Sequence, residues 1–408
     1  MKLSQLAETM PAPAPLAIGN AIRERINNGE QIYNLTIGDF LPSLFPIPQL
    51  LENAIIDAYQ NKQTNYPAPE GNADLREQLS IFIRHFQNLY YAPAEILVAS
   101  GGRPLIFAAY QTIVDKGDKV IYPVPSWNNH YYVQLSGAQG CAIETSVDNN
   151  FMLTAEDIRP HLKDAVLLAL CSPQNPTGTC YTQEQMKSIG DMIVEENSRR
   201  GNGEKKLYVL YDHIYNLLVQ DSAQHVDPVS VCPAMKDYTI FTDAVSKNFA
   251  ATGVRVGWGY GPQQIINKMK TILSHVGAWA PMAEQKALAV FFNDLPGVEE
   301  YLHNFKRKIA RRLDGFYDGL MALRQEGLPV EIIAPQASIY LTVKIDIPGD
   351  IFNELLNEGI AVIPFSAFGA KKADQWFRLS VGTCKLEDIA AILQRFRKVL
   401  MQKIEMAH

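Results

Sequence analysis

The sequence predicts an α/β protein with a mostly parallel sheet, and two observations support that fold class. Between about residues 95 and 260, short apolar runs alternate with stretches of helical periodicity. The apolar runs are continuous instead of alternating with polar residues, which is typical of strands that helices bury on both faces. This alternation of strands and helices favours a parallel sheet sandwiched between layers of helices.

Five of the apolar runs have the length of buried strands, and helical stretches separate them. In one helical stretch Leu105, Ile106 and Ala109 fall on a single face. Another opens with Thr182 and Gln185, the spacing of a capping box in which each side chain bonds the other residue's backbone N–H. The expected strands are residues 96–99, 119–122, 166–170, 207–211 and 238–242.

The pattern changes after about residue 290, where a long charged helix is followed by shorter strands. The expected elements are a helix at 298–325, strands at 338–344, 361–364 and 376–380, and a last amphipathic helix at 386–401. We therefore expect two domains. An N-terminal arm and part of the small domain take residues 1–45, a large domain takes 46–290, and the small α+β domain takes 291–408.

Composition excludes several classes of protein. The 408 residues are 47% hydrophobic and 20% charged, as in ordinary globular proteins, and the formal net charge of −6 gives no reason to expect nucleic acid. The five cysteines include no C-x-x-C pair, so we expect reduced thiols and no metal site. No apolar run approaches the roughly 18 residues of a membrane span, and the N-terminus lacks a signal-peptide pattern. We expect a cytoplasmic protein without a membrane or nucleic-acid partner.

Polar groups follow the expected strands at the edge where an open parallel sheet binds its ligands. A glycine turn, Gly101-Gly102, opens a helix directly after the first strand, and such a turn can cradle a phosphate. Singly these signals are weak, because a strand-ending aspartate is commonly a helix cap. Together they indicate a site. The remaining groups at this edge are Asn175, Asp212, Tyr215 and Lys247.

The chemistry of Lys247 and Arg255 indicates the kind of ligand. The lysine amine can condense with a cofactor aldehyde as a Schiff base, and the guanidinium can grip a phosphate with two hydrogen bonds. Asp212 could keep a pyridine nitrogen protonated, and Trp127 could stack on the ring. The alternative reading of Lys247 is an ordinary solvated loop lysine.

These residues resemble the fold-type I pyridoxal-phosphate enzymes, in particular the class I/II aminotransferases of the aspartate aminotransferase family. The resemblance covers nearly the whole chain in the family's order. It implies a seven-stranded sheet in the large domain, pyridoxal 5'-phosphate as the cofactor and a homodimer. It also implies an aminotransferase that moves an amino group between an amino acid and a 2-oxo acid through the Schiff base of Lys247.

The resemblance assigns roles residue by residue. Gly101, Gly102 and Arg103 match the turn that cradles the phosphate, and Ser246 precedes the Schiff-base lysine. Tyr66 matches a tyrosine lent across the dimer to the neighbour's phosphate. The remaining cofactor residues are Trp127, Asn175, Asp212, Tyr215, Lys247 and Arg255, and the substrate residues are Gly38, Asn175, Arg103 and the α-carboxylate arginine, Arg378.

Three positions depart from the family pattern. Ala244 stands where many members have a serine, so one phosphate hydroxyl is missing, and Ser246 or Thr242 could compensate. His213 replaces an acidic residue at a position that we expect to point outward. Arg103 could read a distal carboxylate of aspartate or glutamate, or it could merely cap its helix.

Two other classes of function remain open at this point. A lyase or decarboxylase could use the same scaffold and cofactor, because a fold does not fix a reaction. A regulator that binds an effector would need a DNA-binding extension, and no basic N-terminal segment supplies one. The natural amino donor depends on pocket contacts that the sequence does not reveal.

Overall fold

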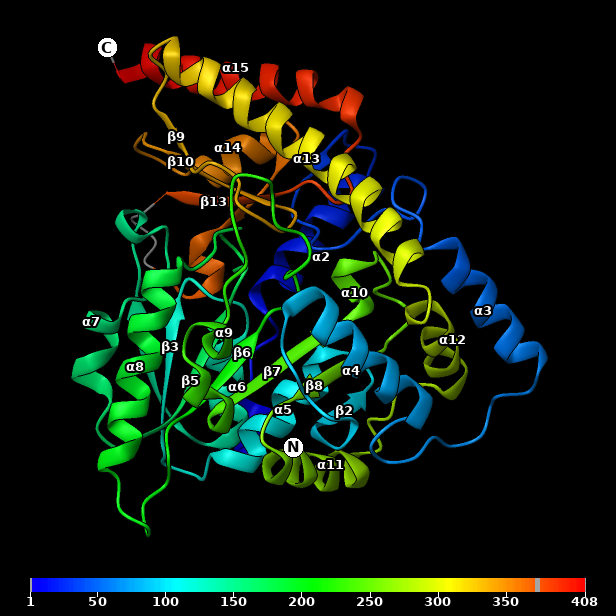
Figure 1. The fold of residues 1–408 in the computed structure, drawn as a ribbon. Coiled ribbons are helices and arrows are strands. Elements are labelled where there is room, and N and C mark those ends of the chain that lie inside the picture. Colours follow the sequence, from blue (N-terminus) through cyan, green and yellow to red (C-terminus); the bar gives the residue numbers. More distant parts are fainter. Residues whose placement is uncertain (1, 371–374, 408) are drawn as a thin grey trace.

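The computed structural model describes residues 2–370 and 375–407, and a seven-stranded sheet forms its centre (Figure 1). The strand order is β2-β8-β7-β6-β5-β3-β4. Only β8 runs antiparallel to its neighbours, so the expected α/β fold with a mostly parallel sheet is confirmed. The strands are β2 (Ile96–Ala99), β3 (Lys119–Val124), β4 (Gln139–Glu144), β5 (Ala165–Cys171), β6 (Tyr208–Asp212), β7 (Thr239–Ala244) and β8 (Gly257–Tyr260).

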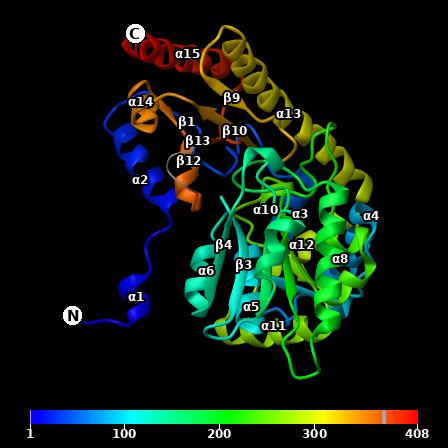
Figure 2. The same cartoon turned by 90° about the vertical axis from the view of Figure 1, so that its left-hand side faces the viewer.

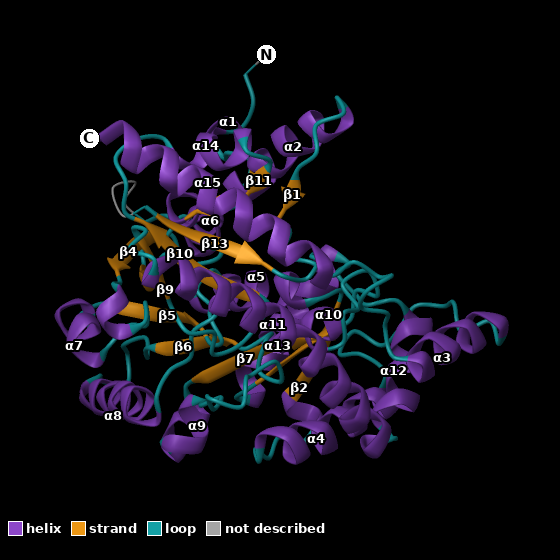
Figure 3. Ribbon diagram, turned by 90° about the horizontal axis from the view of Figure 1, so that it is seen from above, coloured by secondary structure: helices purple, strands orange, loops and turns teal. Residues whose placement is uncertain are grey.

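Helices cover both faces of this sheet, which explains why its strands are continuously apolar. One face packs against α5 (Gly102–Ile113), α6 (Asn129–Ser136) and α11 (Gln263–Val276). On the other face α8, α9 and α4 lie in a row (Figure 3). The helices on and around that second face are α3 (Gln49–Gln60), α4 (Ala73–Gln87), α7 (Ala155–Ile158), α8 (Gln183–Arg199), α9 (Pro228–Val231) and α12 (Met282–Phe292).

A second, smaller body of structure follows the central sheet. Its antiparallel sheet has the order β12-β13-β10-β9, and a separate parallel pair joins β1 to β11. The strands are β1 (Tyr33–Asn34), β9 (Val330–Ile332), β10 (Tyr340–Ile345), β11 (Ile360–Ala361), β12 (Ile363–Pro364) and β13 (Trp376–Ser380). The helices are α2 (Ala14–Asn27), α13 (Leu295–Gln325), α14 (Ile351–Asn357) and α15 (Ile389–Ala407).

The long helix α13 connects the two bodies and runs diagonally past both in Figure 1. Val298 and Leu302, near its start, belong to the core beside the central sheet. From Phe305 to Leu323, its buried side chains belong to the core of the smaller sheet. The N-terminal helix α1 (Gln5–Thr9) lies away from the central sheet in Figure 2. None of the described helices is long and apolar enough to cross a membrane.

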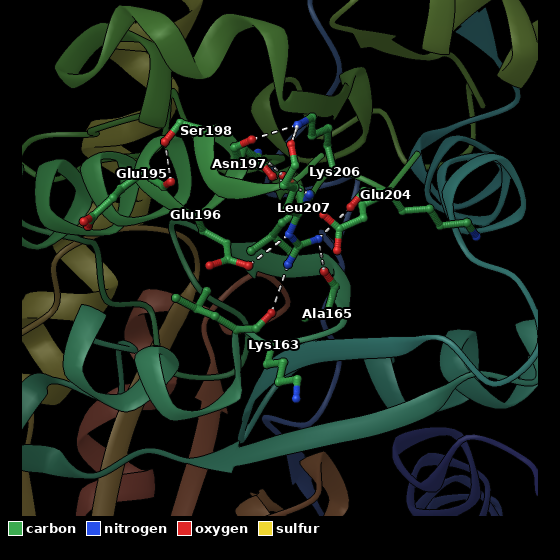
Figure 4. Close-up of polar contacts among 12 residues, drawn as sticks. Lys163, Ala165, Glu195, Glu196, Asn197, Ser198, Glu204, Lys206 and Leu207 are labelled. Carbon is green, nitrogen blue, oxygen red and sulfur yellow. Dashed lines mark hydrogen bonds and ion pairs between the residues drawn. The ribbon is translucent and has the colours of Figure 1, made fainter. Parts of the chain in front are cut away.

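A polar network closes the amino end of the strands, opposite the edge where the site lies. Figure 4 shows Asn197, at the end of α8, beside Leu207 and Lys206. The Asn197 side chain accepts a hydrogen bond from the Leu207 N–H at 2.7 Å and donates to the Leu207 carbonyl at 2.9 Å. Lys206 donates to the Asn197 carbonyl at 2.8 Å. These groups satisfy one another's hydrogen-bond donors and acceptors, so the network at this end of the sheet stabilises the fold.

Candidate active site

Lys247 lies on a single helical turn, α10 (Val245–Asn248), directly beyond the carboxyl end of β7. Its amine donates a hydrogen bond to the carbonyl oxygen of Gly38, a residue far away in the sequence. Loss of solvent around the amine lowers the pKa of Lys247 to about 8. The carboxylate of Asp39 opposes this shift, and three nearby arginines reinforce it. The amine is therefore neutral at a lower pH than that of an ordinary lysine.

Asp212 and Tyr215 lie beside this lysine because β6 and β7 are adjacent parallel strands. Asp212 is the last residue of β6, and burial raises its pKa to about 6 although the Ile214 N–H donates to it at 3.3 Å. The Tyr215 hydroxyl is buried and lies 2.7 Å from the hydroxyl of Tyr340. The carboxylate and the phenol thus reach the edge of the sheet from one short segment.

The N-terminus of α5 forms a small cradle against Arg255. Gly101 has a φ of +94°, and a Cβ there would lie 2.2 Å from the Arg255 guanidinium. Gly257 must also be glycine, because a Cβ would lie 2.5 Å from the carbonyl carbon of Gly101. Arg255 donates to the backbone carbonyls of Thr252 at 2.9 Å and Ser100 at 3.0 Å. Within residues 2–370 and 375–407 it has no carboxylate partner, so the helix N–H groups and the guanidinium suit an anion.

Arg378 is a second cation that has no counter-ion among the residues that the structure describes. Its side chain, in β13, is only 2% exposed, and burial lowers the pKa of the guanidinium. It donates to the Asn175 side-chain oxygen at 2.9 Å and to the Thr36 carbonyl at 2.6 Å. Its Nε has no partner in the described part of the chain, and no carboxylate pairs with it there. A buried charge in this state is a natural receptor for a carboxylate ligand.

Gly38 keeps this part of the site open. A Cβ at this position would lie 2.7 Å from the Tyr340 hydroxyl and 3.8 Å from an Arg378 nitrogen. The guanidinium of Arg378 also lies over the Tyr340 ring, 4.4 Å from its centroid. Any side chain at position 38 would therefore displace Tyr340 or cover Arg378.

Aromatic rings fill the space between Arg378 and Arg103. The Arg378 guanidinium carbon lies 5.0 Å from the Phe368 ring centroid, and that ring lies 6.4 Å from the ring of Trp127. The Arg103 guanidinium carbon lies 5.3 Å from the Trp127 centroid. Arg103 is exposed and forms no ion pair with any residue that the structure describes. Arg103 and Arg378 thus lie at the two ends of a pair of aromatic rings, Trp127 and Phe368, here called the aromatic wall.

Within a single chain, Tyr66 and Ser246 have different surroundings. Tyr66 is 82% exposed, and its ring packs edge-on against Trp279, with the two ring centroids 5.4 Å apart. Ser246 is buried beside Lys247 in α10. The expectation for His213 is wrong: it is 1% exposed instead of pointing outward. It packs against the Phe241 ring, and its Nε2 lies 3.1 Å from the Tyr260 hydroxyl, because this side of β6 faces an aromatic core.

The sequence reasoning missed Asp39 and two buried asparagines near the site, Asn216 and Asn248. Asp39 directly follows Gly38, and its carboxylate accepts a hydrogen bond from the Thr252 hydroxyl at 2.8 Å. It thereby ties the Gly38 segment to the loop that carries Arg255. The signal was present as an acidic residue next to a glycine already singled out, but only the fold shows that the two loops meet.

The arrangement suits a ligand with an aldehyde, a protonated ring nitrogen and a phosphate. Lys247 offers an amine whose pKa is depressed, and Asp212 offers a buried carboxylate. The cradle at Gly101 and Arg255 can take up a phosphate. The separate site at Arg378 leaves room for a carboxylate of a second molecule.

Comparisons with known proteins agree with this chemistry. Residues 30–396 match the family model of class I and II aminotransferases. An aspartate aminotransferase from Bacillus sp. (strain YM-2) is 28% identical over 410 residues, covering 97% of this chain and 99% of that protein. An aspartate/prephenate aminotransferase from Thermus thermophilus is 28% identical over 407 residues, covering 98% of each. The solved structure of the Thermus thermophilus aspartate aminotransferase with maleate has a TM-score of 0.88 at 27% identity, covering 98% of this chain and 100% of that one.

Proposed function

This chain belongs to the class I and II aminotransferase family, and we propose that Lys247 is the residue on which its reaction depends. The protein is a pyridoxal phosphate-dependent aminotransferase, which moves an amino group between an amino acid and a 2-oxo acid. When bound, the cofactor supplies an electron sink for the substrate's α-carbon. Lys247 would hold the cofactor covalently, and its free amine would take the substrate's α-proton at Nζ. The depressed pKa of about 8 makes that nitrogen a competent base near neutral pH.

The other residues of the sheet edge hold the cofactor. The Gly101 and Gly102 turn and Arg255 bind the phosphate, and the buried Ser246 lies next to the anchoring lysine. Asp212 keeps the ring nitrogen protonated. Four residues complete the contacts: Asn175 and Tyr215 at the phenolic oxygen, Trp127 at the ring face, and Arg103 at the start of α5.

Arg378 binds the α-carboxylate of the amino acid, and its environment is the observation that carries this assignment. The guanidinium is buried, held in place by Asn175 and Thr36, and lacks a carboxylate among the described residues. Gly38 leaves the approach to it clear. A bidentate pair between guanidinium and carboxylate fixes the orientation of the substrate as well as binding it.

Aspartate or glutamate fits the position of Arg103. The similar proteins described above include aspartate and aspartate/prephenate aminotransferases. Arg103 lies at the far end of the aromatic wall from Arg378, and its charge is one of those that lower the pKa of Lys247. The two arginines can therefore take the two carboxylates of one substrate. The wall between them, formed by Trp127 and Phe368, also offers contact to an apolar side chain.

A homodimer accounts for the exposure of Tyr66. The Tyr66 side chain is 82% exposed, so a neighbouring subunit can reach it. The preceding helix α3 borders a groove of about 740 Å³ with α4 and α12, and Val290 in its lining is exposed. Ile56 and Tyr59 of α3 are exposed as well. A second copy of the chain, related by a two-fold axis, would cover this face and bring Tyr66 to its neighbour's phosphate site.

A single-turnover experiment tests the reaction. The protein loaded with pyridoxal phosphate is mixed with aspartate or glutamate and followed by absorbance, while ammonia and carbon dioxide are assayed. We expect the bound cofactor to be converted to its pyridoxamine form, with one molecule of 2-oxo acid formed per site. Neither ammonia nor carbon dioxide should be released. Release of ammonia or carbon dioxide in step with substrate loss would instead show a lyase or a decarboxylase on this scaffold.

A further inference from the structure

Asp243 is a buried carboxylate that the reaction described above does not use. It lies in β7, one residue before the strand ends, and is 0% exposed. Its Oδ1 accepts hydrogen bonds from the Ala244 N–H at 2.7 Å and from the Asn248 amide at 3.2 Å. Its Oδ2 accepts from the Asn216 amide at 3.2 Å. No cation among the described residues pairs with it, so these three donors alone offset its burial.

The two asparagines also bond each other. The Asn248 amide nitrogen donates to the Asn216 oxygen at 2.8 Å, and the Asn248 oxygen accepts from the Leu217 N–H at 3.4 Å. Asn216 is 4% exposed and Asn248 is 0% exposed. Asn216, Asp243 and Asn248 therefore form a closed set of hydrogen bonds, here called the Asn–Asp–Asn triangle.

The triangle joins two segments that carry site residues. Asn216 directly follows Tyr215 in the loop after β6, and Asn248 directly follows Lys247 in α10. The helix α10 is a single turn of four residues, too short to be stable by itself. Contacts between α10 and the rest of the protein must therefore fix the direction in which the Lys247 side chain points.

We propose that Asn216, Asp243 and Asn248 are positioning residues that hold Lys247 at a fixed place relative to Tyr215. The inference rests on the proposed function, because that function assigns Lys247 and Tyr215 to the cofactor. Reacting groups must be held within about 0.5 Å of their working positions. A displacement of about 1 Å can lower a rate by about a hundredfold.

The triangle needs both side-chain oxygens of Asp243 as acceptors. The amide groups of Asn216 and Asn248 can each turn over and exchange donor for acceptor. In an Asp243→Asn protein no combination of such turns satisfies all three contacts, because the side chain at position 243 then offers one donor and one acceptor instead of two acceptors. Asp243→Asn should therefore disturb the position of Lys247, as loss of either asparagine should.

The experiment measures how fast the cofactor-free protein combines covalently with pyridoxal 5'-phosphate, followed by absorbance. Asn248→Ala is compared with Asn197→Ala, a matched control. Asn197 is also a buried asparagine, 1% exposed and bonded twice to Leu207, but it lies at the opposite end of the strands. Thermal unfolding of both variants measures their loss of stability.

We expect both alanine variants to unfold at a lower temperature and only Asn248→Ala to combine with the cofactor more slowly, by about tenfold or more. Asp243→Asn should also combine more slowly than the wild type, because one contact of the triangle is left mismatched. If Asn248→Ala does not fold, Asn216→Ala opens the triangle from the other side and carries the same expectation.

Equal combination rates for Asn248→Ala and Asn197→Ala would overturn the proposal, and so would an Asp243→Asn protein that combines at the wild-type rate. Either result leaves the proposed function intact. That function fails separately, if Lys247→Ala still combines covalently with the cofactor.

Discussion

At the scale of single residues, the buried carboxylate of Asp212 costs stability, although the proposed reaction needs it. Burial raises its pKa to about 6, so the folded protein holds the proton more tightly than the unfolded chain, whose aspartates titrate near about 4. The folded state therefore loses stability as the pH rises from about 4 to about 6, and the full cost applies above that range. The bound cofactor offsets this cost by supplying a protonated ring nitrogen.

Replacement of Asp212 by asparagine should separate stability from function. At pH 8 Asp212→Asn should raise the free energy of unfolding of the cofactor-free protein by about 2 kcal/mol, because it removes the buried charge. The gain should shrink toward pH 4, and transamination should be nearly lost because asparagine cannot keep the ring nitrogen protonated. Urea unfolding at both pH values measures the difference. An equal gain at both would show that ionisation of Asp212 is not its cause.

Arg103 decides the choice of substrate in this account. Arg103→Ala should lower kcat/KM for aspartate and glutamate by about ten- to a hundredfold while sparing neutral amino acids, because a charge-assisted hydrogen bond to the distal carboxylate is lost. Arg84, an exposed arginine on α4, provides the control, and Arg84→Ala should change neither class. An equal loss of kcat/KM for charged and neutral substrates would show that Arg103 serves the phosphate site and does not recognise the distal carboxylate.

At the scale of secondary-structure elements, the turn before α5 shapes the phosphate site. Gly101→Ala should weaken binding of pyridoxal 5'-phosphate by about tenfold or more, since the new Cβ would press on Arg255. Gly117→Ala is the control: its φ of +90° imposes a similar backbone strain, but the space around it is open. Both variants should lose stability, and equilibrium binding measures the difference. Equal affinities of Gly101→Ala and Gly117→Ala for pyridoxal 5'-phosphate would show that Gly101 is not part of the phosphate site.

The elements that the sequence predicted are those with a simple physical signal. Five continuously apolar runs became β2, β3, β5, β6 and β7, because burial on both faces requires apolar residues throughout. The residues did not reveal β4, an edge strand whose side chains are mostly exposed, or β8, where two glycines interrupt the pattern. The antiparallel direction of β8 also depends on tertiary pairing, which no local pattern encodes.

The candidate site could be proposed from the sequence where one residue has one characteristic chemistry, as at Lys247, Asp212 and Arg255. It was not predictable where function depends on which loops meet. Asp39 reaches Thr252 only because two distant segments fold together, and the triangle around Asp243 joins two neighbouring strands. Such contacts leave no fixed spacing in the sequence.

At the scale of the whole molecule, two separate cores are joined by α13, and the domain boundaries at residues 45 and 290 remain a prediction. The anion cradle and Lys247 belong to the central sheet, whereas Arg378 comes from the smaller one. In the proposed function, cofactor and substrate are thus held by different bodies of the fold. The site requires both to be in place.

The dimer can be tested by mixing two defective subunits. Lys247→Ala removes the anchor of its own site, and Tyr66→Ala removes the tyrosine lent to the neighbour. In a hybrid dimer, one site then has both residues intact, so co-expression of the two variants should restore up to about a quarter of the wild-type activity. Either variant alone should be far less active. Activity no greater than the average of the two variants would contradict a shared site.

The central claim is that Lys247 carries the cofactor, and covalent labelling tests it most directly. The protein is loaded with pyridoxal 5'-phosphate, reduced with borohydride, digested and analysed by mass spectrometry. The account predicts that the added mass lies on the peptide containing Lys247 and is absent from Lys247→Ala. Stoichiometric labelling of any other lysine, or a label that persists in the variant, would contradict it.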